Sequence, residues 1–256
     1  MKNLKNYIKD YINESYLNES VWDIEDNVES DNKELMLDSV KKFIEDNYGR
    51  INIDSCEIIF DEKENKYIIN CDQPVNLDAR AKQITNGGFK WGTVDGDFDC
   101  SYCTKLENLE GAPEKVSGVF TCFNCPELKS LEGAPEIIGS SFNCNNCSKL
   151  ESLEGAPKTV GGDFWCARCS KLESLEGAPE NVKGNFYCHD CSKLKTLKGA
   201  PKYVGENFDC SNCPELTSLK GSPKEVKFDF SCENCPNLHS LDGIGKVKGN
   251  IISDIQ

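Results

Sequence analysis

Apolar residues recur along the C-terminal two thirds of the chain with a period of 22 residues, and polar residues separate them. The first unit contains Val94, Phe98, Cys100, Cys103, Leu106, Leu109 and Pro113, and the fourth repeats them as Val160, Phe164, Cys166, Cys169, Leu172, Leu175 and Pro179. A fixed period in the twenties is typical of a solenoid, in which each unit buries its apolar edge against its neighbours. We therefore expect seven full units at about 94–247.

The pattern inside one unit predicts a short strand followed by a turn. Phe98 and Cys100 stand two residues apart, so in an extended segment both side chains lie on one face. The Gly-Ala-Pro sequence ends regular structure, since proline lacks a backbone donor and glycine permits tight bends. Stacking such coils about 4.8 Å apart predicts one curved parallel sheet.

Partial units flank the array. At the C-terminal end Val247 and Ile251 keep the apolar places, and Ser253 stands where cysteine is expected, which suits a polar terminal coil. At the other end, we expect a degenerate first coil in which Ile69 takes the Phe place and Cys71 the first Cys place. The solenoid would then occupy 69–256.

The N-terminal region has a helical pattern. Apolar residues at helical spacing predict an amphipathic helix at 2–14, within a segment assigned to 1–20. A second helix is predicted at about Asn32–Asn47, with Asp31 and Glu34 as a capping box and Leu35 among its apolar residues. A hairpin is expected from 51–60 and 67–71, and we interpret 21–68 as a small α/β cap of the first open coil.

The repeat resembles a known family. Phe98, Cys100 and Cys103 would take the second Leu, third Leu and Asn/Cys places of the leucine-rich repeat, L-x-x-L-x-L-x-x-N/C-x-L. The Leu-Glu-Gly-Ala-Pro and Phe-x-Cys-x-x-Cys motifs are similar to those of the short repeat proteins encoded by tailed phages and gut bacteria. The resemblance covers about 69–253 and implies a leucine-rich-repeat-like solenoid.

The first eight residues resemble the capsid-targeting peptide of internal head proteins of tailed phages, which begins Met-Lys and carries aromatic residues and isoleucine. In that family a protease cuts after Leu/Ile-x-Glu, and the chain has such sites before Ser15 and before Ser20. The resemblance implies a protein held in the virion interior.

The net charge and the hydropathy of the chain limit the classes of partner that it can bind. A formal net charge of −14, without a Lys/Arg cluster, excludes the basic surface that nucleic-acid binding needs. We expect no membrane partner either, because the apolar runs are shorter than the ~20 residues that cross a bilayer. The N-terminus lacks the apolar centre of a secretion signal, so we expect a location in the host cytoplasm.

Cysteine chemistry leaves three interpretations open. Fourteen of the sixteen cysteines form Cys-x-x-Cys pairs, and in a reducing cytoplasm all sixteen are expected as thiols or metal ligands rather than disulfides. The favoured interpretation is two inward columns of packed thiols. The alternatives are a zinc-binding structural protein and a redox site, although redox chemistry needs exposed, electropositive thiols.

The residues that flank each Phe and first Cys should face outward, toward a partner. Aromatic residues gather there in the middle coils, and the predicted partner-binding residues on the concave face are Phe123, Trp165, Tyr187, His189 and Arg168. Aromatic residues of this kind are typical of binding hot spots, but they can also simply cover the sheet by cross-strand pairing.

The sequence offers little for catalysis. His189 and His239 are its two histidines, they lie fifty residues apart, and we find neither a catalytic grouping nor a nucleotide-binding glycine motif. We therefore expect no catalytic residues, no cofactor and no metal. The predicted function is a non-enzymatic protein-binding solenoid of phage or phage-related origin that recognises a host or viral protein.

Overall fold

The computed structural model describes residues 28–48, 51–85 and 87–255. The chain forms two compact units, Met1–Asp46 and Asn47–Gln256. The amphipathic helix predicted at 2–14, the targeting peptide and both cleavage sites lie outside the described residues.

The described part of the first unit is one helix, α2 (Val28–Asn47). The predicted end at Asn47 is confirmed, but the helix begins four residues earlier than expected. Asp31 lies inside it, so the N-cap predicted there is wrong. Leu35 is 40% exposed, because the buried stripe runs through Met36, Val40 and Ile44 at helical spacing.

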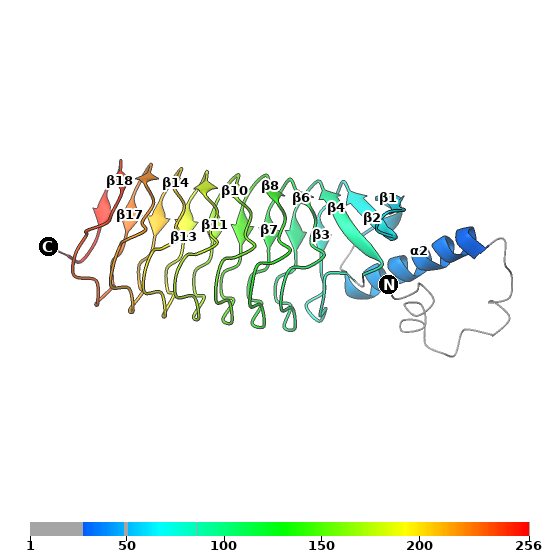
Figure 1. Cartoon of the computed structure of the whole chain (residues 1–256), viewed down its shortest axis with the longest axis horizontal. Coiled ribbons are helices and arrows are strands. Elements are labelled where there is room, and N and C mark those ends of the chain that lie inside the picture. Colours follow the sequence, from blue (N-terminus) through cyan, green and yellow to red (C-terminus); the bar gives the residue numbers. More distant parts are fainter. Residues whose placement is uncertain (1–27, 49–50, 86, 256) are drawn as a thin grey trace. The chain divides into compact units, whose positions relative to one another are not determined.

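The second unit is a solenoid of stacked coils, as predicted, but each coil contributes to two parallel sheets rather than one (Figure 1). We name them after the residue type that each buries. The valine sheet contains, in spatial order, β1 (Glu57–Asp61), β2 (Lys66–Cys71), β4 (Phe89–Val94), β6 (Lys115–Val116), β8 (Ile137–Ile138), β10 (Thr159–Val160), β12 (Asn181–Val182), β14 (Tyr203–Val204), β16 (Glu225–Val226) and β18 (Lys246–Val247). The phenylalanine sheet contains β3 (Val75–Asn76), β5 (Phe98–Asp99), β7 (Phe120–Thr121), β9 (Phe142–Asn143), β11 (Phe164–Trp165), β13 (Phe186–Tyr187), β15 (Phe208–Asp209), β17 (Phe230–Ser231) and β19 (Ile251–Ile252).

The hairpin of β1 and β2 begins the valine sheet. β1 pairs antiparallel with β2, as expected, although it starts only at Glu57 because a 3-10 turn, η3 (Ile53–Ser55), precedes it. β2 in turn pairs parallel with β4. The hairpin is therefore hydrogen-bonded into the solenoid, and the domain boundary predicted between residues 68 and 69 falls inside β2.

The register predicted for the first coil is wrong. Cys71 pairs with Val94 in the valine sheet, and Val75, rather than Ile69, pairs with Phe98 in the phenylalanine sheet. The reason is spacing, because Val75 follows Cys71 by four positions, just as Phe98 follows Val94. At the other end the prediction is confirmed, since Ile251 pairs with Phe230.

A column of stacked phenylalanines occupies the core. Seven rings, from Phe98 to Phe230, are fully buried, and neighbouring rings lie 5.0–5.4 Å apart and nearly parallel. The core leucines and valines of the inner coils are equally buried. Because each coil meets only its neighbours, the interior is one continuous apolar column built from identical layers.

The turn that follows the leucines depends on glycine. Gly155 adopts φ +89°, and a Cβ atom on it would lie 2.5 Å from the backbone of Leu131 in the preceding coil. The equivalent glycines of the other coils have the same positive φ. A side chain at this place would therefore force neighbouring coils apart.

A ladder of side chains joins the coils just before each phenylalanine. The Oδ1 atom of Asp163 accepts the backbone N–H of Asn185 at 2.7 Å, and Asn185 Oδ1 accepts that of Asn207 at 3.0 Å. Asp97 and Asp229 accept the next coil's N–H in the same way. Both Asp and Asn satisfy this bond, so the ladder itself does not require a charge.

We predict that Phe164→Ala lowers the free energy of unfolding by about 3–5 kcal/mol, because it leaves a cavity between Phe142 and Phe186. Urea unfolding followed by circular dichroism measures the change. Ile137→Ala, at a residue that is 55% exposed, is the control and should cost about 0.5 kcal/mol or less. Equal losses for the two variants would contradict the phenylalanine column as the main source of stability.

Candidate functional site

The fourteen paired cysteines are buried free thiols, as the packing interpretation predicts. In every pair after the first, the second thiol donates a hydrogen bond to the backbone carbonyl of the first cysteine in the preceding coil, whereas Cys103 of the first pair donates to the Asp78 carbonyl. Cys125 donates to Cys100, for example, and the bonds from Cys125 through Cys235 measure 3.2–3.5 Å. The thiols therefore act as small core side chains that also link the coils.

The electrostatics of these thiols oppose reactivity. Burial raises the pKa of the Cys166, Cys188 and Cys210 thiols well above the ordinary value, and it raises that of Cys191 to about 12. The pKa of Cys125 is lowered, first by its side-chain hydrogen bond with Cys103. Cys125 is nevertheless buried, and a redox or nucleophilic thiol needs access to solvent as well as a lowered pKa. Among residues 28–48, 51–85 and 87–255, no three His, Cys, Asp or Glu side chains are grouped to hold a metal ion.

Cys56 and Cys71, which lie outside the paired columns, form a disulfide. The expectation that all sixteen cysteines are thiols or ligands is therefore wrong for these two. The pairing of β1 with β2 explains the contact, because it places Cys56, just before β1, beside the end of β2. The disulfide closes the hairpin at the edge of the valine sheet.

The phenylalanine sheet presents the predicted aromatic residues in its outward column. Trp165 on β11 pairs in register with Tyr187 on β13, and their parallel rings have centroids 6.4 Å apart. Both side chains are partly exposed. The other full coils carry smaller polar residues in this column: Asp99, Thr121, Asn143, Asp209 and Ser231. At its ends the column continues to Asn76 on β3 and Ile252 on β19.

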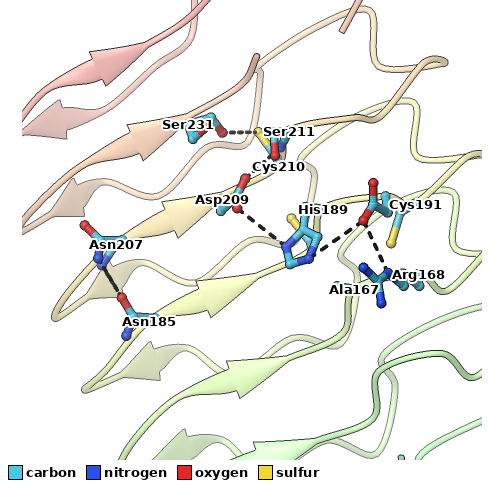
Figure 2. Close-up of polar contacts among 12 residues, drawn as sticks. Ala167, Arg168, Asn185, His189, Cys191, Asn207, Asp209, Cys210, Ser211 and Ser231 are labelled. Carbon is cyan, nitrogen blue, oxygen red and sulfur yellow. Dashed lines mark hydrogen bonds and ion pairs between the residues drawn. The ribbon is translucent and has the colours of Figure 1, made fainter. Parts of the chain in front are cut away.

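His189 extends this pair, as Figure 2 shows for its polar contacts. Its ring meets Tyr187 edge-on, with centroids 6.0 Å apart. Its Nδ1 atom lies 3.5 Å from Asp209 Oδ2, and its Nε2 atom lies 3.9 Å from Asp190 Oδ2. The histidine is thus placed between two carboxylates, next to the aromatic pair.

Arg168 reaches the same cluster through Asp190. Its Nε atom lies 3.3 Å from Asp190 Oδ2, and the side chain is 66% exposed (Figure 2). Both residues occupy the third place of a Cys-x-x-Cys turn, where every coil has a positive φ, 58° at Arg168. Asparagine tolerates this left-handed conformation best and fills the place in several coils, so Arg168 stands in a strained position.

Phe123 does not join the cluster. It lies in the second coil, two coils before Trp165, and its ring contacts Tyr102 at a centroid distance of 5.3 Å. Tyr102 is 54% exposed and is not among the partner-binding residues predicted from the sequence. Its place beside Phe123 follows from the left-handed turn after the strand, which an alternating strand pattern does not reveal. We call Trp165, Tyr187 and His189 the aromatic cluster.

Comparisons with protein-family models, with curated proteins and with solved structures find no match to this chain. Within the described residues, no helix is long and apolar enough to span a membrane. Function is therefore inferred from the chemistry of the face itself.

We predict that the folded protein loses stability in alkaline solution. Burial raises the pKa of thiols such as Cys166, Cys188 and Cys210. Up to about pH 8.5 these thiols are neutral in both states, but above it they ionise in the unfolded chain and stay neutral in the folded one. Each such thiol then lowers the free energy of unfolding by about 1.4 kcal/mol per pH unit. Urea midpoints between about pH 7 and pH 10, at constant reductant, measure this fall.

The paired change Cys166→Ala and Cys188→Ala tests the cause. Two fewer buried thiols should make the decline with pH shallower, relative to the variant's own stability at neutral pH. A decline as steep as that of the unaltered protein would show that other groups control it.

Proposed function

We propose that this protein is a non-enzymatic solenoid, of phage or phage-related origin, that binds a host or viral protein on the outward face of the phenylalanine sheet. The aromatic cluster forms the centre of the proposed surface. The proposed surface also includes Arg168, on the same coil as Trp165, and Phe123, two coils before Trp165.

One observation carries the proposal. Trp165 and Tyr187 occupy a column in which other coils fold equally well with Asp, Thr, Asn or Ser, so the coil does not require large aromatic side chains there. Cross-strand stacking explains how the two rings lie, but not why they are present. Partly exposed aromatic residues at the centre of a rigid face are the residues that dominate protein–protein binding energy.

We expect the double change Trp165→Ala and Tyr187→Ala to weaken capture of the partner by about 30-fold or more, as the loss of a binding hot spot does. The measurement is affinity capture from bacterial lysate with quantitative mass spectrometry, followed by titration of the captured protein.

Phe228→Ala is the matched control, because Phe228 is an aromatic residue with 55% exposure that lies outside the cluster. It should capture the same proteins as the unaltered chain. Unchanged capture by the double variant, with unchanged circular dichroism, would contradict the proposal.

A further inference from the structure

Carboxylates surround the aromatic cluster. The pKa of Tyr187 is raised by partial burial first, and then by the negative charges of Asp163, Asp209 and Glu206. Asp163 lies on the coil before Tyr187, whereas Glu206 and Asp209 lie on the coil after it. The rings are therefore placed in a region of negative potential that spans three coils.

The charges of the whole outward face are unbalanced. Its columns comprise the residue before each phenylalanine, the residue after it, and the two residues between the paired cysteines. Their carboxylates are Asp97, Asp99, Asp163, Asp190, Asp209, Asp229 and Glu233. Arg168 is the cation of these columns, and it already pairs with Asp190. The face thus has an excess of negative charge around its aromatic residues.

In Asp163 and Asp209, near the rings, the Oδ1 atom accepts hydrogen bonds that stabilise the fold, and the Oδ2 atom takes no part in these bonds. Asp163 Oδ1 accepts two hydrogen bonds from Asn185, whereas no described group donates to its Oδ2 atom. Asp209 Oδ1 accepts the N–H of Ser211 at 2.9 Å, and its Oδ2 atom faces His189. The second oxygens remain as acceptors beside an aromatic surface.

We propose that the aromatic cluster, with Asp163 and Asp209 beside it, binds a segment of the partner protein that carries lysine or arginine side chains. The inference rests on the proposed function and specifies the chemistry of the partner. An ammonium or guanidinium group over Trp165 or Tyr187 gains a cation–π interaction, and the adjacent carboxylates accept its N–H groups. Charge complementarity with a chain of net charge −14 also speeds encounter with a basic partner.

Binding of short synthetic peptides tests the proposal by isothermal titration calorimetry. Glycine alternates with arginine, lysine, citrulline or glutamate in four N-acetylated peptides of equal length. The arginine and lysine peptides should bind, and a raised salt concentration should weaken their binding. The citrulline peptide, which has the shape of arginine without its charge, should bind about tenfold more weakly or not at all. Spermine that binds as tightly as the arginine peptide would overturn the assignment to a peptide.

Other coils of the chain carry neutral asparagine at the places that Asp163 and Asp209 occupy. Asn185 and Asn207 occupy the ladder place of Asp163, and Asn143 occupies the column place of Asp209 and makes the equivalent turn bond. The double change Asp163→Asn and Asp209→Asn therefore removes two charges and retains the hydrogen bonds of the fold. It should lower the affinity for the arginine peptide by about tenfold.

Asp97→Asn with Asp99→Asn is the matched control. These residues hold the same two places in the first full coil and make the same bonds, so the net charge changes equally, three coils away from Trp165. The control should leave peptide affinity nearly unchanged. Equal losses in both double variants would indicate general attraction to an acidic protein and would overturn the proposal.

The two proposals fail separately. If the unaltered protein does not distinguish arginine from citrulline, the basic segment is wrong, while loss of capture by Trp165→Ala with Tyr187→Ala still supports the binding face. If that variant captures every protein that the unaltered chain captures, the binding face itself is wrong.

Discussion

Backbone hydrogen bonds between successive coils hold each residue beside its equivalent in the next coil, and every other feature of the solenoid depends on this register. It sets the rings of Phe98 and Phe120 parallel in the core and brings the Cys125 thiol to the Cys100 carbonyl. It also places the Asp163 carboxylate at the next coil's N–H. An inward residue must therefore stack well on a copy of itself, which phenylalanine, leucine and cysteine do.

The same register explains how far the sequence predicts the fold. Residues that recur every 22 positions must occupy equivalent places, so the buried phenylalanines, thiols and leucines could be assigned without a structure. The first coil could not, because Ile69 and Cys71 fit the Phe-x-Cys spacing while Cys71 and Val75 fit the Val-to-Phe spacing. Pairing of Val75 with Phe98 decides between them. The sequence does not predict the valine sheet either, since a strand of two residues has too little alternation of apolar and polar residues to be recognised.

The contacts of the candidate site are likewise only partly predictable from the sequence. The proximity of Trp165, Tyr187 and His189 follows from register and strand alternation, and both can be obtained from the sequence. The pairing of Phe123 with Tyr102 and of Arg168 with Asp190 depends on a left-handed turn between the paired cysteines. Such a turn redirects side chains in a way that hydrophobic periodicity does not encode. The disulfide between Cys56 and Cys71 likewise depends on which strands meet in the hairpin.

Because each inner coil meets its neighbours through nearly the same contacts, an internal duplication or deletion of one 22-residue unit would preserve the joints on both sides. It would, however, change which outward side chains become neighbours, separating His189 from Asp209 or bringing a second aromatic pair alongside the first. Recombination between repeats of a gene with this organisation could thus assemble new recognition surfaces in single steps, without any need to evolve a new core.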